Sequence, residues 1–299
     1  MIHAENVTKR FDQFTALDAA SLHVPQGAVY GLVGPNGAGK STIIRHLCGV
    51  YRPDSGTITI DGQPVWENTT LKQRVQCIPD ELFYFLQASV REMASFYRGF
   101  YPHFNQERYW KLQEAFPNVN AKTPLRRLSK GMQKQAAFWL AICCEPDVMI
   151  LDEPVDGLDP VMRRQVWSLL LGDVAERGMT VLVSSHNLRE LEDVCDHVGI
   201  MHQGRVVLER SLSDLQSSVT KLQAVWEHEV PPVPDGLKLL HQSSSGRLQT
   251  LILRGNPEEV TLRYYDTTPI FMEAVPLSLE EIFIYELGGA DYGVKEILL

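Results

Sequence analysis

A glycine-rich loop stands near the start of the chain, between a short apolar run and a stretch with helical spacing. Residues 34–42 read G-P-N-G-A-G-K-S-T, which satisfies the phosphate-binding pattern G-x-x-x-x-G-K-[ST]. The run 28–33 before it predicts a buried strand, and 43–47 after it predicts a helix. Glycines let successive backbone amides converge on phosphate oxygens, and the helix adds its positive end. The chain is therefore expected to build a strand–loop–helix unit that binds a nucleoside triphosphate.

Within this loop, individual side chains have separate predicted roles. The Lys40 ammonium would reach the β- and γ-phosphates as a point charge. The Ser41 hydroxyl would ligate Mg²⁺ beside them. The full set of predicted nucleotide-binding positions in the loop is Gly34, Pro35, Asn36, Gly37, Ala38, Gly39, Lys40, Ser41 and Thr42.

Composition narrows the class of protein. A chain of 299 residues with 44% hydrophobic and 22% charged residues is expected to fold as a large globular domain plus a small one. The net charge of −9, with no block of Lys or Arg, argues against a nucleic-acid partner. Five cysteines without C-x-x-C spacing are expected to be reduced thiols, not a zinc site. No uninterrupted apolar stretch approaches 18 residues, and no signal-peptide core is visible. We therefore expect any association with a membrane to be provided by another chain.

The pattern of elements up to residue 210 predicts alternating strands and helices. Apolar alternation at 2–7 and 20–24 predicts edge strands flanking a loop with Phe11 and Phe14, and Asp61-Gly62 predicts a hairpin turn. Further buried strands are expected at 148–151 and 180–183, and helices at 159–178 and 188–195. The aromatic, helix-rich stretch from about 86 to 121 predicts a helical insertion, within a helical subdomain of about 86–144. Its aromatic residues could equally form core or a groove for a partner. From 211 to 299, antiparallel strands and two helices that start at Asn256 and at the capping box Ser278–Glu281 predict a small accessory domain.

Two acidic residues follow one of these buried strands, in the sequence V-M-I-L-D-E-P over 148–154. Ligands bind at the carboxyl ends of parallel strands. Asp152 is therefore placed to hold Mg²⁺, directly or through water, and Glu153 to act as general base on the attacking water.

A second capped helix is predicted after the stretch L-S-K-G-M-Q at 128–133. Ser129 would cap it, which leaves the first amides and the Gly131 backbone free to face an anion. Taken alone, this stretch is better explained as an ordinary capped helix.

Together these motifs make residues 1 to about 210 resemble the ATP-binding subunit of an ABC transporter, for which this stretch is the signature, usually L-S-G-G-Q. Gly157-Leu158-Asp159 resembles the D-loop, and Ser184-Ser185-His186 the switch histidine. The resemblance implies an α/β fold: a P-loop NTPase core with an antiparallel β subdomain, the helical insertion and the small C-terminal α+β domain.

The resemblance also implies roles for single residues. Phe11 would stack on adenine, although a core phenylalanine is the alternative, and His186 would contact the γ-phosphate and the catalytic carboxylate. The signature would close over the ATP of a partner subunit with Ser129, Gly131 and Gln133. Asp159 would take part in communication between the two subunits. A chain with one phosphate loop and one signature must therefore pair with a second ATP-binding chain, and a homodimer is favoured.

Two positions depart from the family pattern. Asp80, with Glu81 as the alternative, stands where the family usually has a glutamine, and we expect Asp80 to ligate Mg²⁺ directly or through water. Lys130 replaces a signature glycine, while Ser129 and Gly131 are kept. With the aromatic stretch and the terminal S-L-E-E-I-F at 278–283, these features resemble the bacterial subgroup that serves drug, antibiotic and peptide exporters.

The implied function is ATP hydrolysis that powers export through a separate membrane-spanning permease. The chain is expected in the cytoplasm, peripheral on the inner face of the cell membrane. The alternative is a soluble ABC-type ATPase that is not coupled to transport. A subunit that hydrolyses ATP poorly is less favoured because Glu153 and His186 are both present. For the C-terminal domain the sequence allows dimer contacts or regulation.

Overall fold

The computed structural model describes residues 1–85 and 87–287, which form two compact units. The first contains Met1–His186 and Val194–Glu209, and the second joins Asn187–Asp193 to the chain from Arg210 onward. The predicted helical insertion and C-terminal domain include residue 86 and residues 288–299, which lie outside the described residues. Each unit is described by itself.

A sheet that is mostly parallel forms the centre of the first unit. Its strand order is β10-β9-β3-β8-β7-β6, and the pairs β3–β8, β3–β9, β7–β8 and β6–β7 are parallel. The central strands are buried along their whole length, as expected for a sheet covered on both faces. The strands are β3 Val29–Val33, β6 Val75–Ile78, β7 Val148–Asp152, β8 Thr180–Ser185, β9 His197–His202 and β10 Arg205–Ser211.

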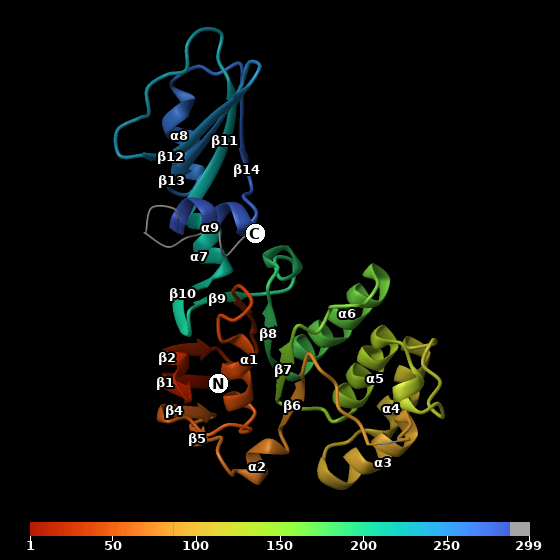
Figure 1. The fold of residues 1–299 in the computed structure, drawn as a ribbon. Helices are drawn as coiled ribbons and strands as arrows, with labels where there is room; N and C mark the ends of the chain where they lie inside the picture. Colours follow the sequence, from red (N-terminus) through yellow and green to blue (C-terminus); the bar gives the residue numbers. More distant parts are fainter. Residues whose placement is uncertain (86, 288–299) are drawn as a thin grey trace. The chain divides into compact units, whose positions relative to one another are not determined.

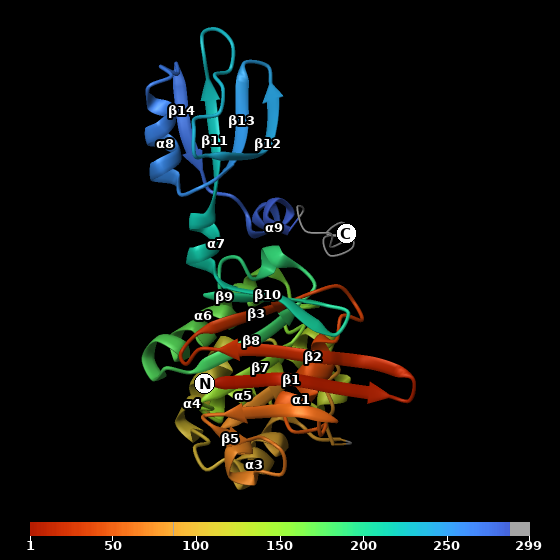
Figure 2. The ribbon, with the colours of Figure 1, turned by 90° about the vertical axis from the view of Figure 1, so that its left-hand side faces the viewer.

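A second, antiparallel sheet has the order β2-β1-β4-β5, and Figure 2 shows β2, β1 and β4 side by side. Helix α1 packs against both sheets, because its buried residues Ile43, Ile44 and Leu47 belong to the core that the two sheets share. These elements are β1 Ile2–Phe11, β2 Phe14–Val24, β4 Ser55–Ile60, β5 Gln63–Pro64 and α1 Lys40–Leu47.

The helical part of this unit lies beside β6 and β7 and away from the antiparallel sheet, as Figure 1 shows. Helix α5 packs on α3, α4 and α6, and its residues from Lys134 to Cys143 are buried. The helices are α2 Thr69–Lys72, α3 Val90–Phe100, α4 Gln106–Ala115, η1 Leu125–Arg127, α5 Lys130–Cys143 and α6 Pro160–Arg177.

The second unit is an antiparallel sheet of order β12-β13-β11-β14 with α8 packed on it. Its core is formed by residues such as Leu222, Leu253 and Tyr264. Both predicted helix caps are present, at Asn256 for α8 and in the box between Ser278 and Glu281 for α9. The elements are η2 Leu188–Glu190, α7 Leu212–Ser218, β11 Val219–Val225, β12 Lys238–Ser245, β13 Leu248–Arg254, α8 Pro257–Tyr265, β14 Phe271–Val275 and α9 Leu279–Leu287.

Two predictions of local structure are wrong. β1 pairs with both β2 and β4, so it is an interior strand. It continues past residue 7 to Phe11, and β2 begins at Phe14, so both phenylalanines lie in strands and not in the predicted loop. The pairing shifts register between Ala4 and Val7, where Asn6 has φ +49°, so the apolar alternation ends while the strand continues. The predicted helix at 188–195 is only a 3₁₀ turn, because Leu188 and Leu191 are three residues apart, a spacing that a 3₁₀ turn also satisfies.

Candidate functional site

Three neighbouring parallel strands bring the predicted catalytic motifs to one edge of the sheet. β8 lies between β3 and β7, and all three end at the same level: Val33 pairs with Ser185, and Asp152 with Ser184. The phosphate loop follows β3, the two acids end β7, and His186 follows β8. This is the edge at which ligands bind in open α/β sheets.

At two positions of the phosphate loop, neighbouring backbone atoms leave no room for a side chain, so only glycine fits. A Cβ at Gly34 would overlap the carbonyl oxygen of Met201, and one at Gly39 would lie 2.8 Å from the carbonyl oxygen of Ala16. Gly39 also has φ +107°, which side-chain-bearing residues rarely adopt. It is the N-cap of α1 and provides no side-chain cap, so the first amides of this helix are available to an anion.

The Lys40 side chain lies at the base of the loop and is 5% exposed. Its ammonium donates a hydrogen bond to the carbonyl oxygen of Gly34 at 2.6 Å and lies 3.4 Å from a carboxylate oxygen of Glu153. The loop is therefore folded around a buried positive charge, as phosphate binding requires.

The Asp152 carboxylate is 5% exposed and held by a neighbouring hydroxyl. Ser184 Oγ donates to Asp152 Oδ1 at 2.6 Å, and the backbone N–H of Glu153 donates to the same Oγ at 3.1 Å. Carboxylate and hydroxyl oxygens are the ligands that Mg²⁺ prefers, so Asp152 and Ser41 fit the ion by their chemistry. When bound, the ion would supply positive charge to the phosphate oxygens.

The Glu153 carboxylate is held between a cation and an imidazole. Its Oε2 lies 2.9 Å from Nδ1 of His186, while Oε1 faces Lys40. The side chain is 12% exposed and that of His186 is 49% exposed, so the pair lies at the mouth of the site. Asp156, which the sequence reasoning did not include, has an oxygen within 4.8 Å of the ligand atoms of both.

The signature segment begins α5 as predicted from Ser129. Ser129 Oγ accepts a hydrogen bond from the N–H of Met132 at 3.3 Å, which completes the cap. A Cβ at Gly131 would lie 2.7 Å from the carbonyl oxygen of Gly157. The start of α5 and the D-loop of the same chain are thus in close contact, which glycine permits.

The remaining signature and D-loop residues make contacts within the chain. The Gln133 amide donates to the carbonyl oxygen of Leu128 at 3.0 Å. Asp159 caps α6 by accepting from the N–H groups of Val161 and Met162, both at 3.0 Å.

Phe11 and Asp80 lie on the surface of the first unit. The Phe11 ring is 41% exposed and packs edge-on against Tyr51, with ring centroids 5.5 Å apart, so it is not a core residue. The Asp80 side chain is 56% exposed, and one of its carboxylate oxygens lies 3.6 Å from the ammonium of Lys134.

The sequence reasoning missed Lys134 altogether. It is a lysine, 6% exposed, at the start of the long buried run of α5, and it donates to the backbone carbonyl of Glu153 at 2.6 Å. A charged residue that opens an otherwise buried stretch was the available signal, because buried lysines need a partner.

Comparison with known proteins places this geometry in a family. The model of the family described as "ABC transporter" matches residues 17–156. The chain is 28% identical to the ABC transporter ATP-binding protein YtrB of Bacillus subtilis, over 97% of this chain and 99% of that protein. It is 31% identical to the Nod factor export ATP-binding protein I of Burkholderia pseudomallei, over 96% of this chain and 97% of that protein. A solved dimeric ATP-binding cassette with bound ADP and Pi shares the fold, with TM-score 0.64 and 21% identity over 71% of this chain and 99% of that chain.

These matches confirm the predicted fold class, a P-loop NTPase core of the ABC ATPase type, and the prediction of an ATP hydrolase. The relatives include subunits named for export. In the described part of the chain, no helix is both long and apolar enough to cross a bilayer. The chain belongs to the family of ABC transporter ATP-binding proteins.

Proposed function

We propose that this chain powers an exporter: two ATP molecules close a dimer of ATP-binding subunits, hydrolysis opens it, and a separate membrane permease converts these changes into transport. The observation that carries the proposal is the Glu153 carboxylate held between Lys40 and His186 at the ends of three parallel strands. This arrangement provides a cation for the phosphates and a base for water in one place.

In the proposed reaction, each protein group has a distinct task. The amides of the phosphate loop and Lys40 hold the β- and γ-phosphates. Glu153 accepts a proton from the attacking water. Nδ1 of His186 is hydrogen-bonded to Glu153, so Nε2 is the ring nitrogen that would contact the γ-phosphate. The buried Asp152, with Ser41, would hold Mg²⁺, and Phe11 offers an exposed ring for the adenine.

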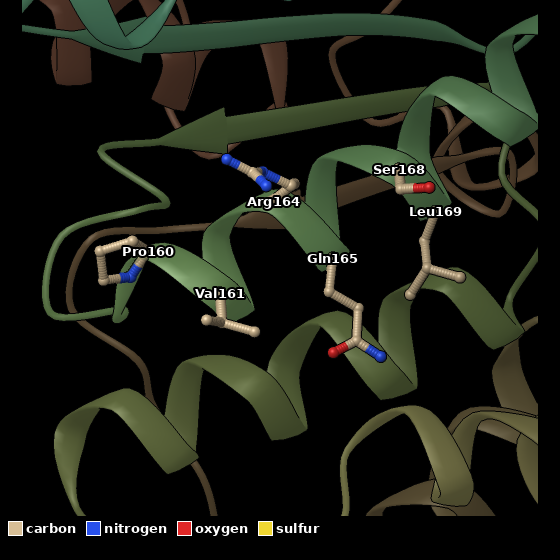
Figure 3. Close-up of a pocket in the computed structure, with 6 residues that line it drawn as sticks. All are labelled: Pro160, Val161, Arg164, Gln165, Ser168 and Leu169. Atoms are coloured by element: carbon tan, nitrogen blue, oxygen red, sulfur yellow. The ribbon is translucent and has the colours of Figure 1, made fainter.

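The dimer proposal rests on the signature and D-loop positions. Ser129 and Asp159 are exposed, and each caps the start of a helix. Directly after Asp159, side chains along one flank of α6 line a shallow hollow of about 640 Å³, shown in Figure 3. Val161 in this hollow is 74% exposed. A surface beside the D-loop that combines apolar side chains such as Val161 and Leu169 with polar ones suits a contact with a second copy of the chain.

A surface cluster of aromatic rings would receive the permease. The rings of Phe85 and Phe96 are 4.9 Å apart and those of Phe96 and Phe100 are 4.6 Å apart. Phe83 is 86% exposed nearby in sequence, whereas Tyr109 of the same aromatic stretch is buried. Exposed apolar clusters mark interaction sites, and an amphipathic helix of the permease is the proposed occupant.

Affinity capture of the tagged chain from its native membranes in mild detergent tests the proposal, with mass spectrometry of the co-purifying proteins. A multi-span membrane protein in near-equal amount is expected, and Phe96→Ala combined with Phe100→Ala should reduce its recovery. Recovery from the soluble fraction without such a protein would contradict export and favour an ATPase that is not coupled to transport.

A further inference from the structure

The backbone of Glu153 is in an uncommon conformation. Its φ is +45°, in the left-handed region that residues with side chains rarely occupy. Such a conformation persists only where the surroundings hold it. Rotation of this residue toward an ordinary conformation would move its carboxylate away from Lys40 and His186, which it now contacts.

Two side chains hold the two peptide groups that flank this residue. The N–H of Glu153 donates to Ser184 Oγ at 3.1 Å, and its carbonyl oxygen accepts from the Lys134 ammonium at 2.6 Å. The first contact restrains φ and the second restrains ψ. Of the two, Lys134 makes the shorter and charge-assisted hydrogen bond, the stronger kind.

The Lys134 ammonium is itself placed by a counter-charge on another segment. Its side chain is 7% exposed, and an oxygen of Asp80 lies 3.6 Å from Nζ. Asp80 belongs to the loop that follows β6, and this loop also binds α5 directly, since Tyr84 donates to the carbonyl oxygen of Gln133 at 3.1 Å. A buried ammonium without a carboxylate nearby would be costly, so the acid stabilises the lysine where it contacts Glu153.

From these contacts we infer that Lys134 is a positioning residue for hydrolysis: it holds the backbone of Glu153, and Asp80 supplies its counter-charge. The inference rests on the proposed role of Glu153 as general base. It assigns a function to a lysine that does not reach the reacting atoms, and it gives Asp80 a role that needs no metal ion.

Steady-state ATP hydrolysis by the purified full-length chain, with ATP affinity measured separately by calorimetry, tests the inference. Lys134→Met removes the ammonium at similar volume and is expected to lower kcat by about tenfold to hundredfold, the effect of misplacing a catalytic group. The affinity for ATP should remain within about threefold, because Lys134 is not a predicted nucleotide contact. Lys134→Arg keeps a charged donor and should recover part of the rate. Lys111→Met, on the exposed side of α4, is the control and should hydrolyse ATP at the native rate.

Combined variants separate this role from a purely structural one. At saturating Mg²⁺, where any effect of Asp80 on metal affinity is absent, Asp80→Asn should lower kcat in the native background. It should have no further effect beside Lys134→Met, because both act through the same ammonium. Likewise Lys134→Met should not reduce the residual rate of Glu153→Gln. If Lys134→Met does not fold, as judged by its thermal transition, the kcat values of Asp80→Asn, of Lys134→Arg and of the variant that combines them provide the same test.

Two results overturn the inference. One is a folded Lys134→Met with the native kcat, and the other is an equal fold-loss in the native and Glu153→Gln backgrounds. Failure of the proposed function looks different: Glu153→Gln itself would then hydrolyse ATP at the native rate.

Discussion

Nδ1 of His186 lies 2.9 Å from Oε2 of Glu153, and the two residues follow adjacent parallel strands. The pairing therefore comes from the sheet itself, since the register of β7 and β8 brings their ends to one level. A base oriented by an imidazole is the arrangement expected of a residue that activates water.

Replacement of Glu153 by glutamine keeps the size of this side chain and removes its basicity. We expect Glu153→Gln to bind ATP while hydrolysing it about 10²–10⁴-fold more slowly. The variant should also accumulate as an ATP-bound dimer in gel filtration. Glu176→Gln, at an exposed position near the end of α6, is the matched control. A native rate in Glu153→Gln, measured by phosphate release, would show that another residue is the base.

The Asp80 carboxylate adds negative charge where the family usually has an amide. If it ligates Mg²⁺ directly or through water, Asp80→Ala should raise the Mg²⁺ concentration needed for half-maximal hydrolysis. Titration of the rate with Mg²⁺ at saturating ATP measures this. A lower turnover with an unchanged Mg²⁺ dependence would leave Asp80 with its contact to Lys134 alone. If turnover were unchanged as well, Asp80 would have neither role.

The sequence predicted the fold and the phosphate loop because local patterns determine them. Lys40 and Gly39 follow from loop chemistry, and the caps at Ser129, Asn256 and Ser278 follow from helix ends that need polar partners. Each of these features depends on residues a few positions apart, so the chain reveals them directly.

The features that the sequence did not predict depend on distant contacts. Lys134 and Glu153 are 19 positions apart, and nothing local indicates that a lysine of α5 reaches a carbonyl after β7. The length of β1 was missed because a register shift near Asn6 breaks its apolar pattern. Pairing with the neighbouring strand continues β1 beyond the point at which its alternation of apolar and polar residues stops.

Gly131 is predicted to be sensitive to a single added methyl group. Its Cβ would lie 2.7 Å from the backbone oxygen of Gly157, so Gly131→Ala should destabilise the protein by about 1–3 kcal/mol. Gly99→Ala in α3 is the matched control, because a Cβ there meets nothing within 4 Å. It should stabilise the protein by about 0.5–1 kcal/mol. Urea unfolding compares the two, and shifts in the same direction would contradict this account.

His46 in α1 gives stability a dependence on pH. It is 1% exposed, and burial lowers its pKa, although a hydrogen bond with the carbonyl oxygen of Thr42 opposes the shift. The unfolded chain therefore binds the proton more readily, and stability should fall as pH drops below about 6.5, by at most about 1.4 kcal/mol per unit from this group. The loss is complete below the folded pKa. His46→Phe keeps a ring against Tyr51 and should show a shallower dependence of the urea midpoint on pH. Equal slopes between pH 5 and 7 would exclude His46 as a source.

The segment directly after His186 belongs to the second unit, which packs it against α9. The N–H of Leu279 donates to a carboxylate oxygen of Glu192 at 3.0 Å, and Arg189 pairs with Glu280 at 2.8 Å. Leu279 is fully buried. The position of α9 therefore restrains a segment that is covalently continuous with the switch histidine.

Displacing α9 should accordingly disturb hydrolysis. Leu279→Asp would bury a carboxylate next to that of Glu192, at a cost of several kcal/mol. We expect faster amide hydrogen exchange over 187–193 and a lower kcat, with ATP affinity little changed because the phosphate loop is intact. Arg189→Ala removes an exposed ion pair, which contributes about 0–1 kcal/mol, and should leave both measurements near native. If exchange over 187–193 rises in Leu279→Asp while kcat stays native, the segment does not restrain His186 and the second unit acts elsewhere.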